Sequence, residues 1–298
     1  YIYFVKVTDM ESIVVEIVTI IQRGEVASES TDYSSDKKVR VLQTAKLGKG
    51  LPIVLMGDGF IDTEINDGTY DAVMDKAFEN LFTEEPIKSL RDYFNVYAVT
   101  AVSKHNIFGT GYETALGCEL AGGNSTGISG EDNAVQRYVQ CVDNIDMSET
   151  LAVVILNSPA YAGTTYFGYT NQTKVVEFAI AYCPVIYDLQ SESFRQVLVH
   201  EAVGHGFAKL EDEYAYQENG TISSKEIKNV QYLQTLGWAQ NVDFTSDPSQ
   251  VLWSAFLNDN RYVSEKLGVF EGACTYIKGA YRPSEESMMN SNTEGFNA

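Results

Sequence analysis

Histidine is scarce in this chain, with three residues, His105, His200 and His205, among 298. Serine and cysteine hydrolases place a histidine base beside their nucleophile. Two of the three histidines fall in one short segment, which leaves His105, and nothing in the sequence places it in a Ser-His-Asp triad. The sequence therefore argues against nucleophilic serine catalysis.

Basic residues are also few, at 21 lysines and arginines against 41 acidic residues, which gives a formal net charge of −20. Such a chain repels the phosphates of nucleic acids and anionic membrane surfaces. We expect no nucleic-acid partner. The negative charge either serves solubility alone or also favours the binding of basic substrates.

Long apolar runs are absent. No stretch reaches the roughly 18 residues needed to cross a bilayer, and Val14 to Ile21 is far too short. Tyr1 to Val5 contains neither an initiator methionine nor a basic region, so no signal peptide is expected in this chain.

The four cysteines, Cys118, Cys141, Cys183 and Cys274, lack Cys-x-x-Cys spacing, which argues against a structural zinc cluster. They permit two disulfides, most simply Cys118 with Cys141, or four free thiols.

The most informative segment is His200-Glu201-Ala202-Val203-Gly204-His205. Two imidazoles can bind a metal, and a carboxylate between them can take a proton from metal-bound water. The familiar spacing is His-Glu-x-x-His, and Gly204 adds one residue to it. The alternative is an ordinary helix whose histidines happen to flank a glutamate.

The added residue changes the geometry of the helix. Residues four apart lie roughly 40° apart around an α-helix, whereas residues five apart diverge by about 140°. A π-bulge restores a shared face, and glycine accepts distorted backbone most readily. We therefore predict a one-residue bulge around residues 202 to 204.

The flanking residues indicate a buried helix. Ser193 with Gln196 has the spacing of a capping box, and apolar residues follow: Val197, Leu198, Val199, Val203 and Phe207. A carboxylate in so apolar a helix is costly unless it faces a cleft or a metal. Glu201 therefore needs a function.

Two histidines leave a catalytic zinc short of one protein ligand. His105 lies in a polar turn and is expected at the surface. Three carboxylates follow the helix, which we expect to end near residues 209 and 210. Our order of preference for the third ligand is Asp212, then Glu213, then Glu211.

The pattern His-Glu-x-x-Gly-His-Gly-Phe-x-x-Leu-x-Asp-Glu-Tyr resembles the signature of the IgA-peptidase family of bacterial zinc metallopeptidases. Residues 52 to 60 and 281 to 290 resemble the segments that open and close that family's catalytic domain. The likeness covers roughly residues 50 to 292, and the helix motif is its most specific part.

This resemblance implies a zincin fold with metzincin-like features, Zn²⁺ as cofactor and an extracytoplasmic location. His200, His205 and Asp212 map onto metal ligands and Glu201 onto the general base. Met288 and Met289 map onto a Met-turn beneath the metal, although paired methionines also commonly fill core gaps.

The order of elements favours an α/β fold with a mixed sheet. Residues 1–48 read as a β-rich segment, and residues 49–298 as the catalytic domain. We expect strands over residues 53–56, 94–102 and 151–156, a helix over residues 70–81, and an edge strand over residues 175–182 that aligns an extended peptide. Asp58 and Asp62 are either calcium ligands or ordinary turn acids.

We expect a zinc-dependent endopeptidase acting on protein or peptide substrates outside the cell. Tyr214 and Tyr281 are candidates to hold the oxyanion, and Tyr161, Tyr166 and Tyr169 either line a groove or pack in the core. The alternative is a non-catalytic zincin-derived surface module that binds glycans or host proteins. A third possibility is an amidase acting on non-peptide substrates.

Overall fold

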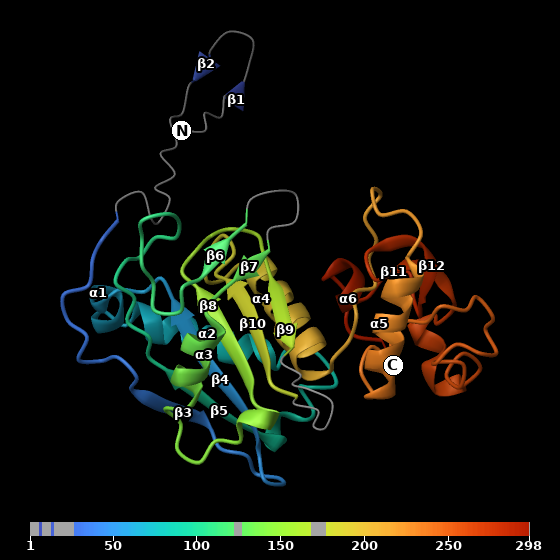
Figure 1. The fold of residues 1–298 in the computed structure, drawn as a ribbon, viewed down its shortest axis with the longest axis horizontal. Helices are drawn as coiled ribbons and strands as arrows, with labels where there is room; N and C mark the ends of the chain where they lie inside the picture. The colour runs from blue at the N-terminus through green and yellow to red at the C-terminus, as the bar shows by residue number, and fades with distance from the viewer. Residues whose placement is uncertain (1–5, 8–12, 15–26, 122–126, 168–176, 298) are drawn as a thin grey trace.

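The computed structural model describes residues 6–7, 13–14, 27–121, 127–167 and 177–297. Figure 1 shows a lobe built on one sheet and, beside it, a second lobe formed by the C-terminal part of the chain. We call residues 27–209 the sheet lobe and residues 210–297 the C-terminal lobe. At the N-terminus, β1 (Lys6–Val7) and β2 (Ile13–Val14) pair with each other. The rest of the β-rich segment before residue 27 lies outside the described residues.

The central sheet has six strands, and the four inner ones are parallel. In spatial order they are β3 (Val39–Gln43), β5 (Phe94–Val99), β4 (Leu51–Asp58), β8 (Leu151–Leu156), β10 (Ala179–Pro184) and β9 (Thr164–Phe167). The edge strands β3 and β9 run antiparallel to their neighbours. The expected mixed sheet is present. Residues 39–43, which the sequence placed in the N-terminal segment, form one edge of this sheet.

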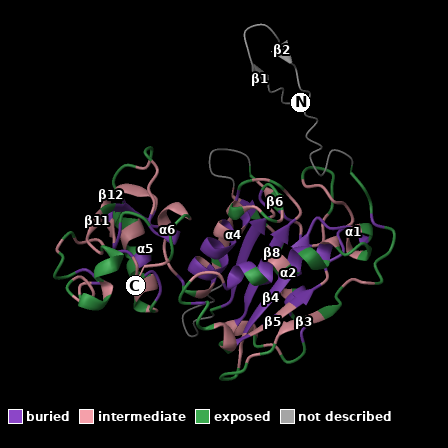
Figure 2. Ribbon diagram, turned by 180° about the vertical axis from the view of Figure 1, so that it is seen from behind, coloured by how far each residue is buried: buried purple, intermediate pink, exposed green. Residues whose placement is uncertain are grey.

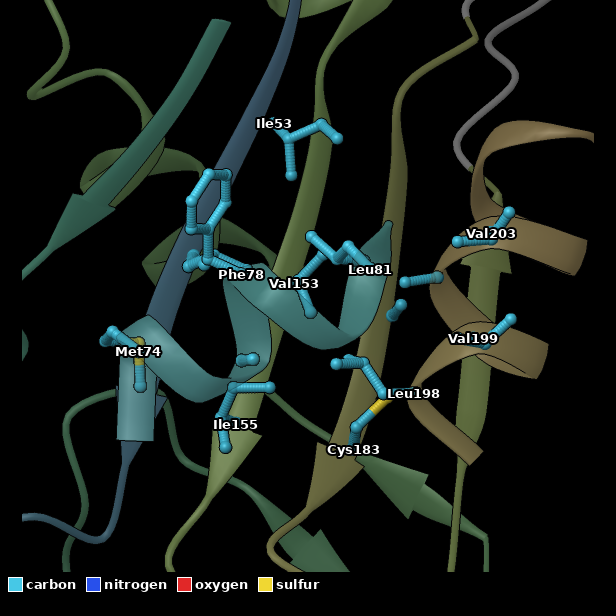
Figure 3. Close-up of a cluster of buried hydrophobic side chains, with 14 of the residues drawn as sticks. Ile53, Met74, Phe78, Leu81, Val153, Ile155, Cys183, Leu198, Val199 and Val203 are labelled. Atoms are coloured by element: carbon cyan, nitrogen blue, oxygen red, sulfur yellow. The ribbon is translucent and has the colours of Figure 1, made fainter. Parts of the chain in front are cut away.

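Helices cover both faces, because the inner strands are apolar on both sides. One face packs on α2 (Thr69–Leu81), α4 (Glu192–Leu198) and the π-helix η3 (Val199–Phe207). Figure 3 shows Leu81 of α2 and Leu198 of α4 directed toward the strands, and Val199 and Val203 of the π-helix belong to the same buried cluster. The opposite face packs on α3 (Asp132–Val139). The sheet core is therefore buried throughout, as the purple strands of Figure 2 show.

The remaining elements are short or belong to the C-terminal lobe. In the sheet lobe they are α1 (Asp62–Asn66), η1 (Arg91–Tyr93), β6 (Glu119–Leu120), β7 (Ile128–Ser129) and η2 (Met147–Glu149). The C-terminal lobe holds α5 (Ser224–Thr235), η4 (Asn260–Glu265), β11 (Phe270–Ala273), β12 (Tyr276–Arg282) and α6 (Met288–Ser291). Its small core includes Val230, Val242 and Ala280, and α6 packs on the π-helix. Among the described residues, no helix combines the length and apolar character that crossing a membrane requires.

Two local expectations were wrong. The strand expected at the sheet edge over residues 175–182 is β10, which lies inside the sheet between β8 and β9. The edge belongs to β9, in a Gly/Thr/Tyr-rich stretch that carries no strong strand pattern. The cap of α4 is Ser191, whose hydroxyl accepts a hydrogen bond from the backbone N–H of Phe194, and not the expected Ser193.

The surroundings of Asp58 and Asp62 decide the role of these two acids. Asp58 is buried and accepts hydrogen bonds from Ser103 and Thr114 and from the backbone N–H groups of Leu116 and Cys118. Asp62 accepts bonds from residues 31 and 32. Donors fill both sites, so these are ordinary turn acids that anchor loops.

The sequence left open whether the cysteines form disulfides. In the structure all four are free thiols.

Tyr70 of α2 ties the sheet together from within. Its hydroxyl accepts hydrogen bonds from the backbone N–H groups of Gly57 and Ala101, at 2.8 Å and 3.3 Å, and donates one to the carbonyl of Val99 at 2.7 Å. Its side chain is 1% exposed. Water cannot replace this hydroxyl at so buried a position.

Tyr70→Phe is therefore expected to lower the free energy of unfolding by about 2 to 4 kcal/mol, because it leaves buried backbone groups unpaired. Tyr232→Phe, on a side chain that is 54% exposed, is the control and should change the free energy by less than about 0.5 kcal/mol. Urea unfolding followed by circular dichroism measures both. Equal effects in the two variants would contradict the assigned role of Tyr70.

Candidate metal centre and catalytic cleft

The segment carrying the histidines is π-helical over Val199–Phe207. Hydrogen bonds of a π-helix join residues five apart, so residues five apart lie on one face. The predicted departure from α-helical geometry is confirmed, and it covers nine residues rather than a single bulge. The added residue between the histidines is absorbed in this way.

Three side-chain atoms converge at this point. The Nε2 atoms of His200 and His205 are 3.1 Å apart, and Asp212 Oδ1 lies 3.3 Å from the first and 3.1 Å from the second. His200 and His205 come from the π-helix, and Asp212 comes from the loop that follows it. Among the described residues, these three form the one group of histidine, cysteine or carboxylate side chains close enough to share a metal ion.

The hydrogen bonds behind the imidazoles fix their tautomers. His200 Nδ1 is 2.9 Å from the carbonyl oxygen of Met288, and His205 Nδ1 is 2.7 Å from that of Leu210. A carbonyl only accepts, so each Nδ1 carries the hydrogen and each neutral ring presents a lone pair at Nε2. Metal-binding histidines typically have such carbonyl partners.

While both rings are neutral, two imidazole lone pairs and a carboxylate oxygen face one another. A positive charge makes this arrangement favourable, either a proton between His205 and Asp212 or a bound metal ion. Burial lowers the pKa of His205, but the charge and hydrogen bond of Asp212 outweigh it and raise that pKa to about 10. Burial raises the pKa of the Asp212 carboxyl, and the two imidazoles hold it well below its usual range. The donor set fits a bound metal ion.

Gly204 has a packing role that the sequence did not reveal. A Cβ atom built on it would lie 2.3 Å from the sulfur of Met289 and 3.0 Å from its Cε. The side chain of Met289 is buried against this part of the helix. The inserted glycine therefore lets residues 287–291, which we call the methionine segment, approach the helix that carries both histidines.

The two neighbouring acids have other partners. Glu213 is 1% exposed and accepts hydrogen bonds from the Ser287 hydroxyl at 2.6 Å and from Asn241 at 2.9 Å. Its backbone N–H also donates to the carbonyl of Met289. Glu211 accepts a bond from the backbone N–H of Asp212. Of the three acids considered as third ligand, the structure brings Asp212 to the histidines and uses Glu213 to hold the methionine segment.

His105 lies away from this cluster, in the loop after β5, where its Nδ1 accepts a hydrogen bond from the backbone N–H of Glu113. Met288 and Met289 are buried in α6, and the carbonyl of Met288 fixes His200.

A cleft of about 380 Å³ opens beside the cluster. Its lining includes the following residues: Tyr161, Gly163, Val197, His200, Glu201, Tyr214, Tyr216 and Asn290. The ring of Tyr214 stacks on His200, with centroids 6.4 Å apart. Tyr281 lies in β12 of the C-terminal lobe and does not line this cleft. Tyr161 faces the cleft, Tyr166 donates to the carbonyl of Ile128, and Tyr169 lies outside the described residues.

The carboxylate of Glu201 points into this cleft from the π-helix and is 8% exposed. Its Oε2 is 2.8 Å from the hydroxyl of Thr165 in β9. Sequence reasoning missed Thr165, because a threonine 36 positions from the motif carries no local signal. Recognising β9 as the sheet edge would have been needed to find it.

Gly204→Ala tests the packing of the methionine segment. We expect it to lower the free energy of unfolding by about 1 to 3 kcal/mol, since the added methyl group overpacks a buried contact. Gly220→Ala is the control, because a Cβ there meets nothing within 4 Å. Chemical denaturation compares the two, and a neutral Gly204→Ala would show that Met289 moves aside freely.

The helix that closes this centre ends at an unusual lysine. Lys209 has a positive φ of 56° and donates from Nζ to the carbonyls of Glu177 and Gly206. Burial lowers the pKa of this amine to about 8, against the opposing charge of Glu177. Lys209 thus satisfies the carbonyl of Gly206, which the helix end leaves free, and joins it to the carbonyl of Glu177 before β10.

One family model matches most of this chain. The family model described as IgA Peptidase M64 matches residues 39–265, well over half of the chain. The match includes the π-helix and Asp212, and it ends before the methionine segment. A comparison with curated proteins found no match. The mixed α/β fold, the His-His-Asp cluster and this match agree, and the chain belongs to the M64 family of peptidases.

Proposed function

We propose that this peptidase is a zinc-dependent endopeptidase with a zincin-type catalytic domain. The observation that supports it most is the convergence of His200 Nε2, His205 Nε2 and Asp212 Oδ1 at the wall of an open cleft that also holds Glu201. Two imidazoles and one carboxylate form a donor set typical of catalytic zinc, which leaves a coordination position for water or substrate.

When bound by these three residues, zinc supplies a water of lowered pKa and polarises the substrate carbonyl. The carboxylate of Glu201 is the proton acceptor from that water. It then carries the proton to the amine that leaves as the peptide bond breaks. Glu201 is 8% exposed, so its electrostatic interactions are screened less than those of a surface carboxylate.

The edge strand β9 is suited to hold an extended substrate. Gly163, the residue before it, lines the cleft, and Thr165 within the strand contacts Glu201. Backbone pairing with a sheet edge is a general way to bind a peptide. Tyr214, whose ring lies on His200, is the tyrosine best placed to act near the reacting carbonyl. Tyr281 would act only indirectly, from β12.

The methionine segment is proposed to be the Met-turn of this fold. The carbonyl of Met288 accepts a hydrogen bond from His200, and the side chain of Met289 packs against the inserted Gly204. Extracellular proteins are the proposed substrates, in an extracytoplasmic setting. The net charge of −20 is compatible with that setting.

Metal analysis tests the centre directly. Purified chain reconstituted with zinc and dialysed should retain about one zinc ion per molecule. His205→Ala should lose it, because two remaining ligands bind zinc weakly, whereas His105→Ala should retain it. Elemental analysis measures all three. Equal retention by the His205 variant would place the metal elsewhere.

Glu201→Ala separates metal binding from chemistry. The variant should keep its zinc and lose hydrolysis by about 100-fold or more, the usual contribution of a general base. Glu265→Ala, an exposed glutamate at the end of η4, serves as the control. The readout is cleavage of casein and of a mixed fluorogenic peptide library. Hydrolysis at the wild-type rate would refute the base assignment. Zinc binding without cleavage by the wild type would favour the non-catalytic binding module.

A further inference from the structure

The side chain of Glu201 is long and has three rotatable bonds, so something must hold its carboxylate in place. The hydroxyl of Thr165 lies 2.8 Å from Glu201 Oε2 and 2.9 Å from the backbone oxygen of the same residue. A single side chain thus contacts both ends of Glu201. Thr165 comes from β9, which is remote in sequence.

Gly163 completes the surroundings of this carboxylate. A Cβ atom at Gly163 would lie 2.6 Å from Glu201 Oε1 and 2.8 Å from its Cγ, and it would also meet Val197. Any larger residue there would push the carboxylate away. The short stretch from Gly163 to Thr165 therefore leaves space for one carboxylate oxygen and offers a hydrogen bond to the other.

We propose that Thr165 is the positioning residue of the general base. This inference rests on the proposed role of Glu201 as proton acceptor. Catalytic groups must be held within about 0.5 Å of their working geometry by packing and hydrogen bonds. Thr165 can do so because it lies in a strand: its partner in the β9–β10 register is Ala181, which is fully buried inside the sheet.

The chemistry of the hydroxyl suits both states of the base. Its one hydrogen can be donated to the charged Oε2 before proton transfer. Once the carboxyl group has taken up a proton, the hydroxyl can donate to the backbone oxygen of Glu201 and accept a bond at its own oxygen. Both partners are already within hydrogen-bond distance, so the side chain stays in place while the proton moves.

The position of Thr165 also links the base to the substrate. The strand that carries it is the proposed docking edge for an extended peptide. The same rigid strand would therefore position both the Glu201 carboxylate and the scissile carbonyl. Loss of the hydroxyl should therefore misplace the base without changing the groove itself. The expected signature is a lowered kcat with KM unchanged.

The test compares Thr165→Val, which keeps the shape and removes the hydroxyl, with Thr165→Ser, which keeps the hydroxyl. Thr165→Val should lower kcat by about 10- to 100-fold, the usual cost of removing such a supporting contact. KM, zinc content and melting temperature should stay close to wild type, and Thr165→Ser should recover most of kcat. A crystal structure of the valine variant should show the Glu201 carboxylate displaced.

Thr150→Val provides a matched control. Thr150 is buried, whereas Thr165 is partly buried, and the Thr150 hydroxyl likewise donates to a backbone carbonyl, that of Asp146, at 2.7 Å. Thr150 precedes β8 outside the cleft lining. This variant should lose some stability and keep its kcat. If it loses kcat to the same extent as Thr165→Val, the effect is structural and the inference is overturned.

The remaining outcomes are also decisive. A Thr165→Val enzyme with kcat within about twofold of wild type overturns the positioning role and leaves the proposed function intact, provided that Glu201→Ala is inactive. A valine variant that loses zinc would assign Thr165 to the metal centre instead. A zinc-loaded wild type that cleaves nothing would overturn the proposed function, and this inference with it.

Discussion

The convergence of three hydrogen-bond acceptors is the constraint on which the candidate site depends. Two imidazole lone pairs and the Asp212 carboxylate lie 3.1 to 3.3 Å from one another. Left without a cation, they repel. The carbonyls of Met288 and Leu210 enforce this by taking the opposite ring hydrogens. The surrounding structure therefore holds a geometry that only a positive charge makes favourable.

Several unrelated parts of the chain serve this constraint. The π-helix puts residues five apart on one face, and Gly204 makes room for Met289. Glu213 binds Ser287 and, through its backbone, Met289, so the loop that carries Asp212 and the segment that fixes His200 are tied together. The two adjacent acids after the helix thus have different partners: Asp212 lies beside the two imidazoles, and Glu213 holds the methionine segment.

The sheet lobe supplies the rigidity. The π-helix packs on β10, β9 and β8, and Val199 and Val203 are buried among the strand side chains (Figure 3). Because protein interiors are packed like crystals, a helix fixed in this way cannot drift relative to the strand edge beside it. Glu201 and Thr165 can therefore keep their contact, although one comes from a helix and the other from the sheet.

The sequence by itself predicted a metal site on the histidine helix and a mixed α/β fold. Apolar strand patterns such as residues 151–156 indicated a buried sheet, and the histidine spacing required a helix that departs from α-geometry; both follow from local periodicity. Asp212, Glu213 and Glu211 stood equally near the helix, so spacing alone gave only an order of preference. Choosing among them required the C-terminal lobe, because Ser287 and Asn241 occupy Glu213. The edge strand β9 and the contact from Thr165 to Glu201 were likewise decided only by tertiary structure, since strand order and contacts between residues 36 apart leave no periodic trace in the chain.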